Sequence, residues 1–318
     1  MEQTRRWRYD FHFEEIVKKD LLSINPEIES ALAANKPVVA LESTVIAHGL
    51  PRPQNLETAQ RLEQIVREEG AMPATIAVLE GKLCVGLNAH QIGSLANNDD
   101  IRKVSTRDLA VAVANDWDGA TTVASTMWIA HRAAIKVFAT GGVGGVHRGA
   151  LPDISADLPE LARTPMIVVC SGAKIVLDLP ATREWLETYG VTVVGYGCDE
   201  MPAFYSRQSG LPVDVRCDSP KEIVQLFVTQ RELGIESALL VTVPVPATAE
   251  VPARTLTEIL DESLRAAEDG NIGGRELTPF LLARMAELSD GATLRANIAL
   301  LENNVRVAAR ISSALSEP

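Results

Sequence analysis

Short runs of β-branched and apolar residues recur along the chain, and helix-like segments separate them. This alternation constrains the fold more than any other feature, because parallel strands need a long crossover, usually a helix, between them. The runs predict strands at 36–46, 74–79, 83–85, 120–123, 137–139, 166–169, 191–195 and 238–243. Amphipathic spacing and capping residues predict helices, the clearest at 55–69, 221–233, 252–268, 278–288 and 293–313. We therefore expect an α/β protein, a single α/β/α sandwich around a central mixed, largely parallel sheet.

The chain has the length and composition of one large domain. Of its 318 residues, 46% are hydrophobic and 23% are charged, which is enough for a sizeable core. No repeat, low-complexity stretch or Pro/Ser linker interrupts residues 25–318, so we predict a single domain there. Residues 1–24 mix charged and aromatic side chains and are predicted to be an N-terminal extension, either a solvated tail or a cover for a neighbouring subunit.

The charge balance excludes one class of partner. The 42 acidic and 30 basic residues give a net charge of −12. A protein that binds nucleic acid through counterion release needs a dense positive surface, so no nucleic-acid polymer is expected as a partner. A small anionic substrate remains compatible, because a pocket can be locally positive.

Cysteine usage and hydropathy indicate the compartment. The four cysteines form no CxxC pair, so neither a zinc site nor a disulfide framework is expected. No apolar run has the length of a membrane span, and the first residues lack the apolar core of a secretory leader. We expect a soluble cytoplasmic protein with no membrane partner.

A glycine cluster, Thr140–Gly145, follows a predicted strand. A dinucleotide-binding fingerprint read from Gly142 has His147 in place of its third glycine. P-loop spacing read from Gly144 continues with Ala150-Leu151 in place of Lys-Ser. The cluster is therefore no nucleotide motif, and it indicates either a plain tight turn or a turn whose backbone N–H groups approach a ligand.

Two charged residues in apolar surroundings are candidates for catalysis. Glu42 lies in the predicted strand 36–46, where burial would raise its pKa and make it a proton donor near neutral pH. Its alternative is a carboxylate that faces solvent or has a structural partner. Lys174 follows the predicted strand 166–169 across a Ser-Gly-Ala turn, close to a predicted helix start. The helix dipole and desolvation would lower its pKa and let the amine form a Schiff base, whereas an exposed helix-start lysine is the alternative.

Acidic residues after the glycine cluster have two interpretations. Asp153 and Asp157 offer the hard oxygen ligands that Mg²⁺ or Mn²⁺ prefers. With Ser155 between them, they also resemble the N-terminal cap of a helix.

Other polar residues could contact an anionic ligand. Lys103 and Thr121-Thr122 carry hydrogen-bond donors that suit a phosphate. His147 and His48 are each compatible with ligand binding and with a structural role, and their spacing does not decide between the two.

Several long motifs run from about residue 26 to residue 313: PVVALESTVIAHGLPRPQN, GATTVAST, KVFATGGVGGVHRGA, DISADL, VVCSGAK, TPFLLARMAEL and LRANIALLENN. Through these motifs the chain resembles the pseudouridine-5'-phosphate glycosidase family, also called the indigoidine synthase A-like family. The resemblance implies an α/β/α sandwich assembled as a homotrimer.

The resemblance also implies roles for single residues. Lys174 would be the nucleophile that forms a Schiff base with C1 of a ring-opened ribose 5-phosphate. Glu42 would be the proton donor, and Asp153 the ligand of Mn²⁺ (or Mg²⁺). The positions that match substrate contacts are Lys103, Thr122, Val123, Ser155, Ala156 and Asp157, and those that match contacts to the base are Thr140, His147 and Asn297. The implied activity is reversible cleavage of pseudouridine 5'-phosphate into uracil and ribose 5-phosphate.

Two departures from the family pattern leave other functions open. The loop between Gly149 and Asp153 is shorter than in the pattern, and Val243-Pro244-Val245-Pro246 replaces Asn-Pro-Ile-Pro. Loss of the amide removes hydrogen-bonding groups, so base recognition could differ while the ribose machinery is retained. The first alternative is therefore a C-glycosyl synthase that joins ribose 5-phosphate to an aromatic acceptor. The second is a non-catalytic sugar-phosphate binding protein.

Overall fold

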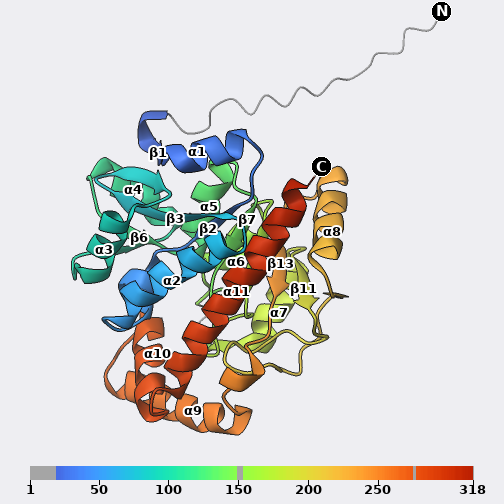
Figure 1. Ribbon diagram of the computed structural model, residues 1–318. Coiled ribbons are helices and arrows are strands. Elements are labelled where there is room, and N and C mark those ends of the chain that lie inside the picture. The colour runs from blue at the N-terminus through green and yellow to red at the C-terminus, as the bar shows by residue number, and fades with distance from the viewer. Residues whose placement is uncertain (1–18, 149–152, 275–276, 318) are drawn as a thin grey trace, which may run out of the picture.

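The computed structural model describes residues 19–148, 153–274 and 277–317 (Figure 1). Its centre is an 11-stranded sheet in the order β1-β4-β3-β2-β7-β9-β13-β11-β12, with β6 pairing β3 and β5 pairing β6. The strands of this sheet are β1 (Leu22–Ile24), β2 (Val38–Leu41), β3 (Met72–Leu79), β4 (Lys82–Val85), β5 (Arg102–Val104), β6 (Gly119–Thr121), β7 (Val137–Ala139), β9 (Ile167–Cys170), β11 (Thr192–Tyr196), β12 (Val215–Cys217) and β13 (Leu239–Thr242). A separate antiparallel pair joins β8 (Val146–His147) to β10 (Leu177–Asp178).

The sheet is mixed and largely parallel, as predicted. Every neighbouring pair from β3 through β2, β7, β9, β13 and β11 to β12 is parallel. Only the pairs of β3 with β4 and with β6 are antiparallel within this sheet. The central strands β2, β7, β9 and β13 are buried along their whole length, which is why their sequences are continuous apolar runs.

Helices fill the connections between strands. The α-helices are α1 (Pro26–Ala33), α2 (Gln54–Glu68), α3 (Ala89–Asn97), α4 (Leu109–Ala114), α5 (Val123–Arg132), α6 (Asp157–Leu161), α7 (Leu179–Thr188), α8 (Pro220–Glu232), α9 (Ala253–Asp269), α10 (Leu277–Leu288) and α11 (Ala292–Ser316). Shorter helical turns are η1 (Lys19–Leu21), η2 (Val45–Gly49), η3 (Thr106–Asp108) and η4 (Ala247–Ala249), of which η2 is a π-helix. No described helix is long and apolar enough to cross a membrane.

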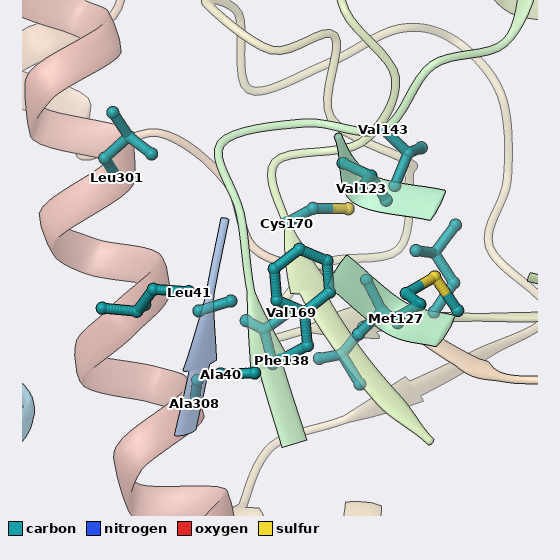
Figure 2. Packing of buried hydrophobic residues seen from close by; sticks show 14 of the residues in the cluster. Ala40, Leu41, Val123, Met127, Phe138, Val143, Val169, Cys170, Leu301 and Ala308 are labelled. Atoms are coloured by element: carbon teal, nitrogen blue, oxygen red, sulfur yellow. The ribbon is translucent and has the colours of Figure 1, made fainter. Parts of the chain in front are cut away.

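The helices form two layers, one on each face of the central strands. α11 packs on β2, β7 and β9 and runs beside α2 and α8, whereas α5 packs on β2, β3 and β4 and contacts α6 (Figure 1). Figure 2 shows Leu301 and Ala308 of α11 on one side of these strands and Val123 and Met127 of α5 on the other. Each fully buried aliphatic side chain in such a core contributes about 1.5–3 kcal/mol. The predicted three-layer α/β/α arrangement is confirmed.

One predicted strand is shorter than expected. The run at 36–46 forms a strand only as far as Leu41, and Val45–Gly49 form the π-helix η2 instead. The apolar side chain of Ile46 is nonetheless buried, in a second cluster between α2 and α3. An apolar, β-branched run therefore signalled burial correctly and the type of element wrongly, so Glu42 follows the strand and does not lie within it.

Two other boundaries also differ from the prediction. Val123, expected at the end of a strand, is the first residue of α5, because Thr122 adopts the extended conformation of an N-cap. The helix expected after Lys174 begins only at Leu179, behind the short strand β10. The prediction that Lys174 lies close to a helix N-terminus was wrong.

The segments that flank these elements are described in part. From the predicted N-terminal extension, residues 19–24 form η1 and β1, and β1 pairs with β4. Residues 1–18 and the shortened loop at 149–152 lie outside the described residues.

Candidate functional site

Loops that follow β2, β7 and β9 meet at the carboxyl edge of the sheet, where the segment after β6 joins them. Parallel strands bring their carboxyl ends to one edge, which is the usual ligand-binding edge of such sheets. Together with α10 and α11, these segments enclose a pocket of about 160 Å³. It is lined by nine of the predicted site residues, Glu42, Lys103, Thr122, Val123, His147, Ser155, Asp157, Lys174 and Asn297. Thr140, Ala156 and Asp153 are not among its lining residues.

Glu42 is a buried carboxyl group directly after β2. It is 8% exposed, and its Oε1 accepts a short hydrogen bond from the hydroxyl of Thr140. Burial raises the pKa of Glu42, although the charges of Lys174 and Lys103 and the hydrogen bond from Thr140 oppose the shift. Thr140 does not line the pocket, but it contacts the site through its hydrogen bond to Glu42. A carboxyl group that keeps its proton in this way is suited to act as a general acid.

Lys174 is positioned by the glycine cluster. Its backbone N–H donates to the carbonyl of Val143 at 3.1 Å, and the N–H of Val143 donates to the carbonyl of Gly172 at 3.1 Å. Gly172 has a φ of +79°, which a glycine adopts without strain. Among the charged groups near Glu42, Lys174 has the largest effect on the pKa of Glu42, which it lowers. The loop after β9 thus brings an amine close to the buried acid.

Asn304 of α11, which sequence reasoning missed, connects the loops that carry Thr140 and Ser171. It is fully buried, and its Nδ2 donates to the carbonyl of Thr140 at 2.9 Å. Its side chain also exchanges hydrogen bonds with the hydroxyl of Ser171, and the N–H of Ser171 donates to Gly141. Asn297 lies two helical turns earlier on the same face of α11 and lines the pocket. The motif LRANIALLENN gave no signal for Asn304, which follows Glu302 and Asn303 at its polar end.

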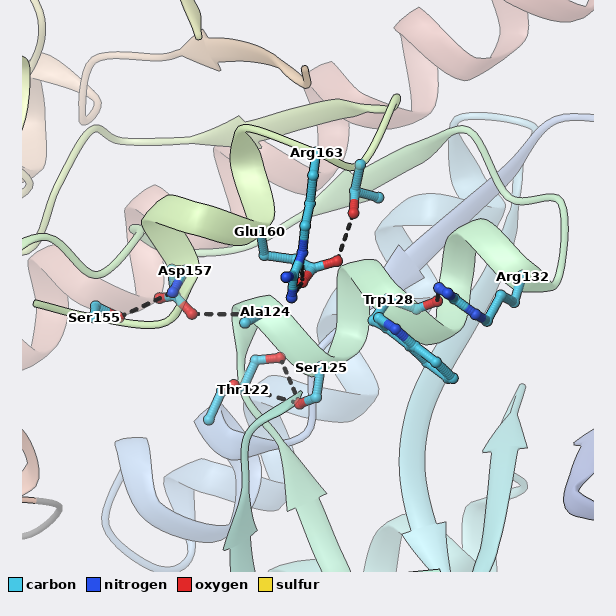
Figure 3. Close-up of polar contacts among 10 residues, drawn as sticks. Thr122, Ala124, Ser125, Trp128, Arg132, Ser155, Asp157, Glu160 and Arg163 are labelled. Atoms are coloured by element: carbon cyan, nitrogen blue, oxygen red, sulfur yellow. Dashed lines mark hydrogen bonds and ion pairs between the residues drawn. The ribbon is translucent and has the colours of Figure 1, made fainter. Parts of the chain in front are cut away.

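Asp157 joins the glycine cluster to the start of α5 (Figure 3). Its Oδ1 accepts from the backbone N–H of Ala124 at 2.9 Å, and its Oδ2 accepts from that of Gly144 at 2.8 Å. Its own N–H donates to the hydroxyl of Ser155. The cap of α6 is Ala156, which makes no side-chain capping bond. A helix begins at Asp157, as predicted, but the carboxylate of Asp157 lies at the N-terminus of α5 and does not cap α6.

Lys103 is a second cationic residue of the pocket. Lys103 lies in β5, in register with Ala120 of β6, and Thr122 follows at the N-cap of α5. The charge of Lys103 acts on the pKa of Glu42, and it lowers the pKa of His48 and of His147. A lysine beside the amino end of a helix is an arrangement that suits a phosphate.

His147 lines the pocket, and Asp153 lies next to His147 but outside the lining. The backbone N–H of His147 donates to the carbonyl of Asp153 at 2.8 Å, and the side chain of Asp153 is exposed. Burial lowers the pKa of His147, while the charge of Asp153 opposes that shift. Among the described residues, no group of three or more His, Cys, Asp or Glu side chains could hold a metal ion. These residues therefore do not fit a protein-made cage for Mn²⁺ or Mg²⁺.

An apolar wall, not foreseen from the sequence, closes the pocket. It is formed by Leu177, Phe204, Pro279, Leu282 and Leu301. Phe204 has a φ of +61°, an uncommon conformation for a bulky residue, and residues held in such conformations cluster at functional sites. A Cβ on Gly142 would meet its ring at 2.7 Å, so the glycine allows this packing. Val243, by contrast, is 3% exposed and does not line the pocket, so its substitution removes no pocket contact.

The chain is similar to known proteins over nearly its whole length. The sequence profile of the family described as indigoidine synthase A like protein matches residues 27–314. A pseudouridine-5'-phosphate glycosidase of Paracoccus denitrificans is 51% identical over 300 residues, which cover 93% of this chain and 99% of that protein. One of Clostridium botulinum is 50% identical over 299 residues, which cover 93% and 97%.

Solved structures show the same likeness. The prealnumycin C-glycosynthase AlnA, in complex with ribulose 5-phosphate, has a TM-score of 0.86 and 39% identity, and the match covers 94% of this chain and 98% of AlnA. An indigoidine synthase A-like protein of Thermotoga maritima has a TM-score of 0.86 and 36% identity, with coverage of 93% and 97%.

Proposed function

The chain belongs to the indigoidine synthase A-like family, and from this premise we propose that it is a pseudouridine-5'-phosphate glycosidase, a lyase that splits pseudouridine 5'-phosphate reversibly into uracil and ribose 5-phosphate. The observation that carries the proposal is that one pocket holds both Lys174 and the buried acid Glu42. About half of all residues are shared with glycosidases along 93% of the chain, which supports the same substrate.

The reaction requires an amine because a C–C glycosidic bond has no heteroatom leaving group. The Nζ of Lys174 attacks C1 of the ribose and displaces the ring oxygen, which takes a proton, so the sugar opens. The nitrogen lone pair then forms a C=N bond as the bond from C1 to the base breaks. A proton adds to the ring carbon of the base, and uracil leaves. Water hydrolyses the iminium and returns Lys174 as a free amine with ribose 5-phosphate.

The other residues of the pocket bind and orient the substrate in this proposal. Glu42 donates the proton to the ring carbon of the base, since burial raises its pKa and keeps it protonated to higher pH, and the attacking amine of Lys174 releases the proton that the ring oxygen takes. Lys103, Thr122 and Val123 bind the phosphate at the amino end of α5. The sugar contacts proposed from the family pattern are Ser155, Ala156 and Asp157.

The base is proposed to lie against the apolar wall, where Phe204, Leu282 and Leu301 offer a surface for a flat ring. Thr140, His147 and Asn297 are proposed as its polar contacts. Because Val243 does not line this pocket, its presence in place of the Asn of the family pattern does not favour a different base.

Mn²⁺ (or Mg²⁺) is proposed to bind through Asp153. A divalent ion held by one carboxylate, waters and substrate oxygens is a common arrangement for such hard cations. When bound, the ion supplies positive charge beside the substrate. The proton and electron movements described above are performed by Lys174 and Glu42.

Assembly and location follow the family in this proposal. We propose a homotrimer, for which exposed apolar residues near the end of α8, Val228, Leu233 and Ile235, offer a surface. The four cysteines are free thiols, which suits the reducing cytoplasm. Light scattering after gel filtration measures the assembly, and a monomer would contradict it.

A second candidate function is C-glycosyl synthesis, which the likeness to AlnA favours. Such an enzyme would use Lys174 and Glu42 in the reverse direction and accept an aromatic ring. The higher identity to glycosidases, 51% against 39%, ranks it second. A non-catalytic sugar-phosphate binding protein is disfavoured, because Glu42, Lys103 and Lys174 all line one pocket.

The test is uracil release from pseudouridine 5'-phosphate by the purified protein, together with borohydride reduction in the presence of ribose 5-phosphate. We expect uracil release and a stable ribitol phosphate adduct on Lys174. Lys174→Ala should lower turnover by several orders of magnitude. Lys174→Arg keeps the charge but not the nucleophilic amine, so its turnover should be equally low. An adduct without uracil release would support the synthase, and normal turnover of Lys174→Ala would overturn the Schiff-base mechanism.

A further inference from the structure

His48 lies on η2 and lines the same pocket as Glu42 and Lys174, but the mechanism above does not use it. Its Nε2 is 2.9 Å from the carbonyl oxygen of Ile101. A carbonyl oxygen only accepts hydrogen bonds, so Nε2 carries the proton and Nδ1 carries a lone pair. Nδ1 is shielded from water and has no hydrogen-bond partner within the described part of the chain.

A buried acceptor without a partner is unusual and costs free energy, so an orphaned group in a pocket points to a ligand that supplies the missing donor. The imidazole is neutral at neutral pH, because burial lowers the pKa of His48; the hydrogen bond to Ile101 opposes this shift and the charge of Lys103 adds to it. A neutral Nδ1 can accept from a hydroxyl group. It cannot bind a phosphate dianion, which carries acceptors only.

The charged side chains of the pocket have few free acceptors to offer a sugar. One carboxylate oxygen of Glu42 already accepts from Thr140, and both oxygens of Asp157 already accept from backbone N–H groups. The ammonium groups of Lys103 and Lys174 are donors only. A ring-opened ribose carries several hydroxyl groups, each of which needs an acceptor once it leaves water.

We propose that His48 is a further substrate-binding residue, whose Nδ1 accepts a hydrogen bond from a hydroxyl group of the ring-opened ribose 5-phosphate. The contact with Ile101 holds the imidazole in the required tautomer, and the π-helical turn of η2 presents it to the pocket. This inference rests on the proposed function, since that function brings a polyhydroxylated sugar to the pocket.

Two variants test the hydrogen-bonding roles of Nε2 and Nδ1 one at a time. His48→Gln places an amide near Nε2, so it retains a donor toward Ile101 and loses the acceptor at Nδ1. His48→Asn places an amide near Nδ1, so it retains an acceptor for the sugar and loses the contact with Ile101. The concentration of ribose 5-phosphate that gives half-maximal borohydride trapping on Lys174 is measured for both variants and the wild type.

We expect half-maximal trapping of His48→Gln to require about tenfold more ribose 5-phosphate than that of the wild type, because one neutral hydrogen bond is lost. The concentration that His48→Asn requires should be closer to that of the wild type. Competition by inorganic phosphate should be unchanged in His48→Gln. The inference is overturned if His48→Gln matches the wild type, if it binds better than His48→Asn, or if its competition by phosphate weakens in parallel.

Two further outcomes distinguish the causes of failure. Thermal unfolding of both variants shows whether they fold, and loss of the folded state in both would make His48 structural and overturn the inference. A wild-type protein that cannot be trapped at all would instead refute the proposed function.

Discussion

Thr140 donates a hydrogen bond through its hydroxyl group to Oε1 of Glu42, and the two side chains are only 2% and 8% exposed. Because Oε1 accepts this bond, Oε2 is the oxygen that can hold the acidic proton. The carbonyl of Thr140 is held in turn by Asn304 of α11. The proton donor is thus fixed by a chain of buried hydrogen bonds that begins in the longest described helix.

Glu42→Gln should lower uracil release by a factor of about 10²–10⁴, the usual contribution of a general acid. The pH dependence of the wild type follows from the raised pKa of Glu42. The protonated form is present below that pKa, so the rate limited by proton donation should fall as pH rises through it. A pH–rate profile measures this, and an unchanged alkaline limb in Glu42→Gln would contradict the assignment.

The same pKa shift predicts that stability, like activity, falls as pH rises through the raised pKa. A carboxyl group whose pKa is raised in the folded state stabilises the fold fully below its ordinary pKa of 4.5, and this contribution is lost as pH rises through the raised pKa. Glu42→Gln removes the ionisation. Its unfolding temperature should therefore decline less than that of the wild type as pH rises above 4.5, and a parallel decline would contradict the burial of the charge.

Asp157→Asn should destabilise the fold by about 1–3 kcal/mol, because one of two buried backbone N–H groups would face an amide N–H in place of an acceptor. Ala124 and Gly144 are the donors concerned. Asp178→Asn is the matched control, since within the described part of the chain the carboxylate of Asp178 accepts only from the N–H of Ala181 at an N-cap, where Asn serves equally well. Denaturant titration of both variants checks this, and equal effects would contradict it.

The buried strands were the most predictable part of the fold. Val137–Ala139 has the predicted bounds, because a strand buried on both faces needs an unbroken apolar run. The same signal failed at Val45–Gly49, where apolar side chains are buried from a π-helix. Propensity and pattern report burial, and the neighbouring elements decide which backbone conformation achieves it.

The site was less predictable from spacing than from resemblance. Glu42, Lys174 and Asn297 are far apart in the sequence, and they meet in one pocket through the order of the strands and the packing of α11 on them. Asn304 could not be identified from its neighbours, because its partners are loop groups at Thr140 and Ser171. Residues that act through backbone carbonyls leave little trace in a single sequence.

Gly144→Ala should displace the loop that carries the glycine cluster. A Cβ there would overlap the hydroxyl of Ser155 and lie 2.7 Å from Oδ2 of Asp157, so the bond between Asp157 and the N–H of Gly144 cannot persist unchanged. We expect a loss of about a hundredfold in uracil release, as for a small misplacement of catalytic groups. Gly93→Ala in α3 is the control, since no atom lies within 4 Å of its Cβ, and alanine favours a helix. Equal activity of the two variants would contradict the role of the loop.

Metal removal should lower activity without changing stability. Asp153 is exposed, and the described residues provide no cage of three ligands, so the ion should bind weakly and leave on dialysis against EDTA. We expect uracil release to fall and to return with added Mn²⁺, while the unfolding temperature stays constant. Asp153→Ala should raise the Mn²⁺ concentration for half-maximal activity, and Asp100→Ala, an exposed aspartate outside the pocket, should not. An ion that resists EDTA, or whose removal lowers the unfolding temperature, would show a tighter site than one carboxylate can form.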